Sequence, residues 1–135
     1  MNAELLVMNG TKNVLKDKSF AFAIRIVKLY KYLIEEKKEY VLSKQLLRSG
    51  TAVGALIREA QNAESKADFI HKLAIAQKEC DEAIYWIELL FHSSFIVDSE
   101  YQSICGDANE ILRIIKSSIL TTKERYSKNS KLQTK

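Results

Sequence analysis

The middle of the chain carries an unbroken heptad pattern, which restricts the fold more than any other feature of the sequence. Between positions 69 and 90, apolar or small residues recur with alternating gaps of four and three. They are Phe69, Leu73, Ala76, Cys80, Ala83, Ile87 and Leu90. This spacing places one apolar seam along an α-helix, which must be buried against another helix. The 135 residues include no proline and four glycines, so few positions force a helix to stop.

Three further segments show helical periodicity, so four helices are predicted. They cover about residues 18–38, 42–63, 66–94 and 101–122. The first has a wide apolar face made of two adjacent rows of side chains. These rows are Phe20, Ala23, Val27, Tyr30 and Ile34, and Phe22, Ile26, Leu29 and Leu33. Ser65 with Asp68, and Ser99 with Gln102, resemble capping boxes that begin the third and fourth helices.

Four amphipathic helices joined by short loops pack as antiparallel neighbours. The sequence therefore predicts an all-α fold, an antiparallel up-down-up-down four-helix bundle covering residues 17–126. Residues 1–16 are weakly patterned and contain a turn signal at Asn9 and Gly10, so a weakly structured N-terminal segment is expected there. Residues 127–135 are expected to form a basic C-terminal tail.

The second predicted helix contains a strip of small residues. Glycine inside a helix costs about 1 kcal/mol relative to alanine, so Gly50 and Gly54 need a structural reason. Positions four residues apart share one face of a helix, and the pair therefore makes a flat strip where another helix can approach closely. We interpret this strip as a packing and assembly element.

A short loop also sets which charged residues of the second and third helices meet. If the loop centres near Glu64, Arg48 can reach Glu79 or Glu82, and Glu59 can reach Lys72. Two interpretations stay open. These residues are either ordinary surface charges, worth about 0–1 kcal/mol per pair, or a semi-buried network that fixes how helices or subunits dock.

Two adjacent aromatic residues, Tyr85 and Trp86, cannot both lie on the seam of the third helix. They are either stacking platforms for single-stranded nucleic acid or part of a subunit interface, where Tyr and Trp are enriched. The net charge of −2 over residues 65–97 repels phosphate and favours the interface.

The net charge of +4 is concentrated at the C-terminal end, where five basic residues from position 123 onward face only Glu124. A basic tail can follow a phosphate backbone, or it can simply keep the protein solvated. The first predicted helix adds a polar stripe that is also basic. The candidate nucleic-acid-binding residues are therefore Arg25, Lys28, Lys31, Lys123, Arg125, Lys128 and Lys131.

No catalytic, metal or cofactor site is expected. A di-iron bundle needs two Glu-x-x-His motifs, whereas Asp68 with His71 is the nearest approach. Cys80 and Cys105 lie on apolar seams with no histidine predicted beside them, against the pairing that nucleophilic catalysis needs. No segment approaches the roughly 20 apolar residues of a membrane span, and we expect a cytoplasmic protein without a small-molecule substrate.

Three segments carry a family resemblance: residues 48–61, which begin Arg-Ser-Gly-Thr-Ala-Val-Gly-Ala, and residues 65–79 and 85–90. They closely resemble the four-helix proteins encoded in intervening sequences of bacterial 23S ribosomal RNA genes, over about residues 18–125. The matching positions are Arg48 to Ala55, Glu59, Ala60, Asp68, Phe69, Lys78 and Glu79. Leu56 departs from the family, which commonly has asparagine there.

The resemblance implies a four-helix bundle that assembles into a ring-like homo-pentamer. The accessory variability protein of diversity-generating retroelements is similar in fold, and for those relatives the resemblance implies nucleic-acid binding by a basic surface. Two functions therefore remain open for this chain. It is either a non-enzymatic homo-oligomer that binds RNA or DNA, or a structural or protein-interaction scaffold without nucleic-acid binding.

Overall fold

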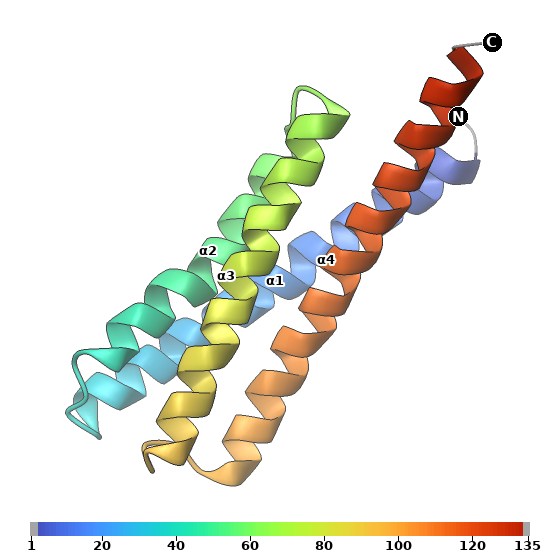
Figure 1. The fold of residues 1–135 in the computed structure, drawn as a ribbon. Helices are drawn as coiled ribbons and strands as arrows, with labels where there is room; N and C mark the ends of the chain where they lie inside the picture. The colour runs from blue at the N-terminus through green and yellow to red at the C-terminus, as the bar shows by residue number, and fades with distance from the viewer. Residues whose placement is uncertain (1–2, 134–135) are drawn as a thin grey trace.

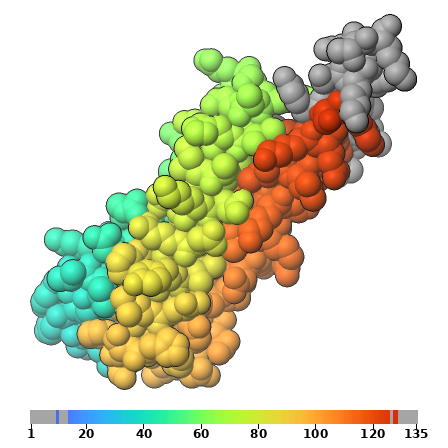
Figure 2. Space-filling view, viewed as in Figure 1, coloured from blue at the N-terminus to red at the C-terminus, as the bar shows by residue number. Residues whose placement is uncertain are grey.

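A computed structural model describes the backbone of residues 3–133 and the side chains of residues 14–125, 127 and 128. Its elements are α1 (Ala3–Glu35), α2 (Leu42–Gln61), α3 (Lys66–His92) and α4 (Asp98–Gln133), and the described backbone contains no strand. The four helices lie along one another as an elongated bundle (Figures 1 and 2). The predicted all-α four-helix bundle is confirmed.

Contacts between the helices show their directions. Lys18 and Arg25 of α1 pair with Glu110 and Asp107 of α4, so the numbers rise along one helix as they fall along the other. The pairs that Arg48 and Glu59 of α2 make with α3 have the same antiparallel order. The two turns joining α1 to α2 and α3 to α4 lie at one end of the bundle, while the chain termini lie toward the other (Figure 1).

The core is built from the predicted seams, with one correction in α1. Every residue of the α3 seam is buried. In α1, however, only the row Phe22, Ile26, Leu29 and Leu33 is buried. Phe20, from the other row, is 53% exposed, and Ile24 beside it is 43% exposed. Because α1 faces only α2 and α4, one row fills the core. The other members of the second row, Ala23, Val27, Tyr30 and Ile34, are half-buried at its edge.

Both outer helices are longer than the sequence predicted. The helix α1 begins at Ala3 and continues through Asn9 and Gly10, where a turn was expected. Each of these two residues disfavours helix by only about 1 kcal/mol or less, which neighbouring helix formers outweigh. The helix α4 continues to Gln133, so most of the expected tail is helical.

The helix starts agree only in part with the predicted capping boxes. Ser65 does cap α3, accepting a hydrogen bond from the amide of Asp68 at 3.0 Å. The helix α4 instead begins at Asp98, one residue before Ser99, and Gln102 donates to the Asp98 carboxylate at 3.5 Å. An aspartate in the first turn is favoured by the positive end of the helix dipole, which explains the earlier start.

The glycine strip packs against α1. An added Cβ atom at Gly50 would lie 2.8 Å from Cγ1 of Ile26, and one at Gly54 would lie 3.4 Å from the backbone oxygen of Ser19. The close helix approach that the two glycines predict is therefore confirmed, and it occurs inside one subunit.

Candidate nucleic-acid interface

Arg25, a candidate nucleic-acid-binding residue, lies in an ion-pair network between α1 and α4. Its guanidinium lies 2.7 Å from the carboxylate of Asp107 and 3.2 Å from that of Glu100, and donates to the Ser103 hydroxyl at 3.0 Å. Partial burial lowers the pKa of Arg25, but the bonds and charges of Asp107 and Glu100 outweigh burial and raise it. Arg25 therefore joins two helices, with most of its donors already engaged.

Lys28 and Lys31 are exposed and belong to a larger group of lysines at one end of the bundle. We call this part of the molecule the turn end, which consists of residues 28–44 and 93–100. Its exposed lysines are Lys28, Lys31, Lys37, Lys38 and Lys44. The turn end also contains five carboxylates, Glu35, Glu36, Glu39, Asp98 and Glu100, so its formal net charge is zero. Glu39 is buried just before α2 and Glu100 is paired with Arg25, which leaves five exposed lysines beside three exposed carboxylates.

Two tyrosines lie among these lysines. Tyr32 is 41% exposed and Tyr40 is 55% exposed. The ammonium nitrogen of Lys37 lies 6.0 Å from the centre of the Tyr32 ring, at the outer limit of a cation–π contact. Accessible aromatic rings beside lysines are typical of surfaces that bind single-stranded nucleic acid.

A hollow of about 480 Å³ opens beside Tyr32, between α1 and the start of α4. Its walls are partly apolar, from Leu29, Ile96 and Val97, and partly charged. The full lining is Arg25, Lys28, Leu29, Tyr32, Ile96, Val97 and Glu100. Its volume lies within the range of about 300–1,000 Å³ found for small-ligand sites.

The C-terminal candidates lie far from the turn end. Lys123 and Lys128 are exposed on α4, and Arg125 is half-buried. The side chain of Lys131 lies outside the described residues. Because Lys18 pairs with Glu110, the antiparallel register places Lys123 level with residue 5. At about 1.5 Å per residue, Lys28 and Lys123 are therefore roughly 35 Å apart along the bundle. One subunit presents two separate basic regions.

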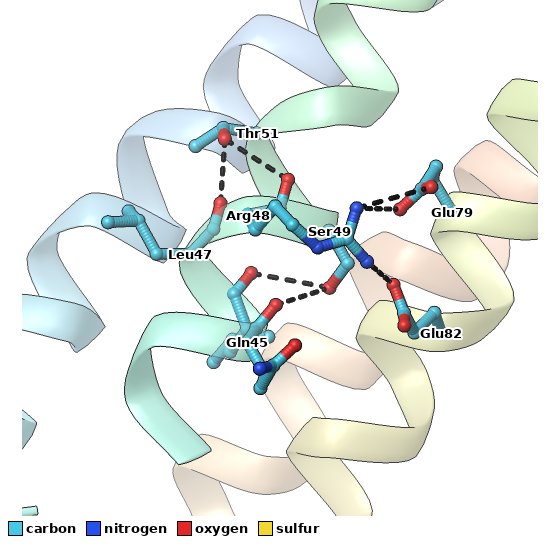
Figure 3. A network of polar contacts seen from close by, with 8 residues as sticks. Gln45, Leu47, Arg48, Ser49, Thr51, Glu79 and Glu82 are labelled. Carbon is cyan, nitrogen blue, oxygen red and sulfur yellow. Dashed lines mark hydrogen bonds and ion pairs between the residues drawn. The ribbon is translucent and has the colours of Figure 1, made fainter. Parts of the chain in front are cut away.

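The predicted partners of Arg48 are confirmed. Its guanidinium extends from α2 to Glu79 and Glu82 of α3, at 3.2 Å from Glu79 (Figure 3). The side chain of Glu79 is only 18% exposed, whereas that of Arg48 is 53% exposed. The network therefore lies at the edge of the α2–α3 contact. Glu79 is largely buried, as a semi-buried network requires, whereas Arg48 is as exposed as an ordinary surface charge. The hydrogen bonds that Arg48 donates to Glu79 and Glu82, together with the negative charges of these carboxylates, raise the pKa of Arg48 against the opposing effect of burial.

The other predicted pair also forms. Lys72 of α3 lies 3.7 Å from the carboxylate of Glu59. Farther along α3, Tyr85 is 55% exposed and its ring meets Trp86 edge to face, with the ring centres 4.9 Å apart. Trp86 is half-buried, and its indole nitrogen is buried without a hydrogen-bond partner among the described residues.

Both thiol groups are buried, and burial disfavours the thiolate form that acts as a nucleophile. Burial, together with the charge of Asp81, raises the pKa of Cys80 to about 12, and its Sγ lies 3.4 Å from the carbonyl oxygen of Ala108. Burial also raises the pKa of Cys105. Within the described residues no group of three or more His, Cys, Asp or Glu side chains is placed to hold a metal ion.

Comparison with known proteins identifies the family. The model of the 23S rRNA-intervening sequence protein family matches residues 11–117. The chain belongs to this family. A solved structure from Bacteroides thetaiotaomicron VPI-5482, described as a protein of unknown function from the S23 ribosomal protein family, is 55% identical with a TM-score of 0.80. The match covers 81% of this chain and 97% of that one.

Membership of the intervening-sequence family confirms the resemblance that the residues predicted, and it leaves the biochemical role open. None of the functionally curated proteins matches the chain. In the part of the chain that the structure describes, no helix is long and apolar enough to cross a membrane.

Two features of this family member could not be read from the sequence. The Arg25 network joins the first and last helices, and no short loop fixes their register. The hollow beside Tyr32 depends on that same register and on the turn between α3 and α4. The sequence does place Lys28, Lys31 and Tyr32 close together on one predicted helix. This spacing indicates a basic and aromatic surface, but it does not reveal the hollow.

Proposed function

We propose that this protein is a non-enzymatic, homo-oligomeric four-helix bundle that binds RNA or DNA through its basic surfaces. The observation that carries the proposal is the turn end, where five exposed lysines and two exposed tyrosines lie in one part of the bundle. Lysines attract phosphates without regard to sequence, and accessible aromatic rings add stacking with bases. Arg25 joins α1 to α4 beside Lys28 and Tyr32.

Assembly would bring separate basic regions together. One subunit has a lysine-rich turn end and a second basic region on α4, roughly 35 Å away. In a ring, which the family resemblance implies as a pentamer, each region is repeated around the assembly. Several weak contacts on one nucleic-acid strand then reinforce each other through effective concentration.

The surface that we propose for assembly lies on the outer side of α1 and α2. Phe20 and Ile24 are four residues apart on α1, and both are largely exposed. The Arg58 guanidinium lies 5.2 Å from the centre of the Phe20 ring, which places the outer side of α2 beside this pair. Thr51 and Ala55 precede Arg58 by seven and three residues and continue the same face with small side chains. A surface with exposed apolar side chains beside small ones suits contact with a second subunit.

Nucleic-acid binding is tested by titrating labelled single-stranded and double-stranded RNA and DNA at about 50 mM and about 200 mM salt. We expect binding whose logarithm of affinity falls linearly with the logarithm of salt concentration, because each neutralised phosphate releases counterions. Replacing Lys123, Lys128 and Lys131 together by glutamine should reduce both the affinity and the salt slope.

The matched control is Lys78→Gln, which removes an exposed lysine from the acidic helix α3 and should leave the affinity unchanged within about twofold. If none of the four nucleic acids binds at low salt while the protein remains folded, the nucleic-acid proposal is wrong. The scaffold without nucleic-acid binding is then the remaining function.

Assembly is tested separately by measuring molecular mass with light scattering. We expect the wild type to be larger than one chain of 15.5 kDa. The double variant with Phe20→Asp and Ile24→Asp should dissociate, because two apolar contacts would be replaced by carboxylates that lose their hydration when the surfaces meet. Tyr85→Asp provides the comparison, since Tyr85 is equally exposed on α3. Dissociation by Tyr85→Asp alone would move the interface to α3, and a monomeric wild type would rule out assembly.

A further inference from the structure

We propose that the hollow beside Tyr32 is a binding site for one unpaired nucleobase and its phosphate. The base would stack on the Tyr32 ring, and the ammonium groups of Lys28 and Lys37 would hold the phosphate. This inference rests on the proposed nucleic-acid binding and deepens it, since it assigns a particular site and a preference for unpaired bases.

The shape of the site suits an aromatic ring. The hollow has about 480 Å³ of space, and Leu29, Ile96 and Val97 supply apolar walls. Tyr32 lines it and keeps 41% of its surface accessible. A flat base entering the hollow would exchange water on both of its faces for contact with the tyrosine ring and aliphatic side chains.

The charges around the hollow suit an anion at its rim. The guanidinium of Arg25 is already paired with Glu100 and Asp107, so it is held in place at the side of the hollow and is not assigned to the phosphate. Lys28 lies in the lining itself and is exposed. Lys37 does not line the hollow, but its ammonium nitrogen lies 6.0 Å from the centre of the Tyr32 ring. A phosphate attached to a stacked base would therefore lie within reach of two flexible ammonium groups.

An unpaired base fits this arrangement and a duplex does not. In a duplex the two faces of each base are covered by neighbouring bases, so stacking on Tyr32 would require a base to leave the helix. Single strands offer their bases without that cost. The lysines would still attract a duplex, but only through its phosphates.

The test compares a short oligouridylate with an RNA duplex of the same length, using fluorescence anisotropy at low salt. Tyr32→Leu should weaken oligouridylate binding roughly 5- to 100-fold and leave duplex binding within about twofold. Tyr40→Leu is the matched control, because Tyr40 is an exposed tyrosine at the same end of the bundle and does not line the hollow. It should weaken oligouridylate binding less than Tyr32→Leu does, because Tyr40 can stack with a base at the surface but does not line the hollow that would enclose it.

A second matched pair tests the phosphate contact. Lys28→Gln should weaken oligouridylate binding more than Lys44→Gln, which removes an exposed lysine of the turn end outside the hollow. Competition by uridine monophosphate shows whether the hollow binds a free nucleotide or only a nucleotide within a strand. Competition that depends on Tyr32 indicates that the hollow accepts a free nucleotide, and its absence indicates that the base is held only as part of a strand.

The inference is overturned if the wild type binds oligouridylate and Tyr32→Leu has no larger effect than Tyr40→Leu. Equal binding of duplex and single strand, with equal sensitivity to Tyr32→Leu, also overturns it. These results leave the proposed function intact. If no polynucleotide binds while uridine monophosphate still binds in a Tyr32-dependent manner, the proposed function fails and the site remains. If the variants melt at the same temperature as the wild type, their loss of binding is not caused by unfolding.

Discussion

Replacing Glu39 by alanine should lower the free energy of unfolding by about 2–4 kcal/mol. The Glu39 carboxylate accepts hydrogen bonds from the amides of Leu42 and Ser43, each at 2.7 Å, and from that of Val41 at 3.1 Å. Val41, at the N-cap position of α2, makes no capping bond with its own side chain. The Glu39 carboxylate therefore accepts the hydrogen bonds of the first amides of α2. Alanine at position 39 would leave these partly buried amides without that acceptor.

The same contacts make this stabilisation depend on pH. Burial of the Glu39 carboxyl raises its pKa, but the hydrogen bonds from Ser43, Leu42 and Val41 outweigh burial, so that the pKa is lower in the folded protein. A lowered pKa means that the stabilisation is complete above the unfolded pKa of about 4.3 and is lost as pH falls through the folded value. The stability difference between wild type and Glu39→Gln should therefore be constant near neutral pH and shrink below about pH 4.

Urea unfolding followed by circular dichroism measures both effects. Glu36→Ala is the matched control, because Glu36 is exposed on the same turn and should change stability by less than about 0.5 kcal/mol. A Glu39→Ala variant that is as stable as Glu36→Ala at neutral pH would contradict the capping role. A difference between wild type and Glu39→Gln that does not change with pH would contradict the pKa argument.

Short loops explain which parts of the fold and candidate site could be predicted. The loop between α2 and α3 consists of four residues, so the sequence fixes how the two helices slide past each other. Arg48 therefore meets Glu79 and Glu82, and Glu59 meets Lys72, as the sequence predicts. The heptad spacing likewise identifies the buried side of α3 completely.

Contacts between α1 and α4 could not be predicted in the same way, because most of the chain separates these helices. The sequence placed Arg25 among exposed cations, whereas its partners Glu100 and Asp107 lie 75 and 82 positions away. Periodicity also could not choose between the two apolar rows of α1. The choice depends on the direction of α2, which buries Ile26 against Gly50 and leaves Phe20 exposed.

Gly50→Ala should destabilise the protein, whereas Gly54→Ala should leave it equally stable or stabilise it by up to about 1 kcal/mol. Both changes gain about 1 kcal/mol of helix propensity. At Gly50, however, the new Cβ would lie 2.8 and 2.9 Å from Cγ1 and Cγ2 of Ile26. Ile26 is fully buried and branches at Cβ, so it cannot turn aside freely. Overpacking of this kind costs about 1–3 kcal/mol and exceeds the propensity gain in most of that range.

At Gly54 the nearest atom is the Ser19 oxygen at 3.4 Å, an ordinary van der Waals distance, so the propensity gain remains. Chemical unfolding of the two single variants compares them directly. A third measurement assigns the cause: in an Ile26→Ala background, where all three contacted atoms are gone, Gly50→Ala should no longer destabilise, giving a coupling of about 1–3 kcal/mol. Equal stabilities for Gly50→Ala and Gly54→Ala would show that α1 can move away from α2 without cost.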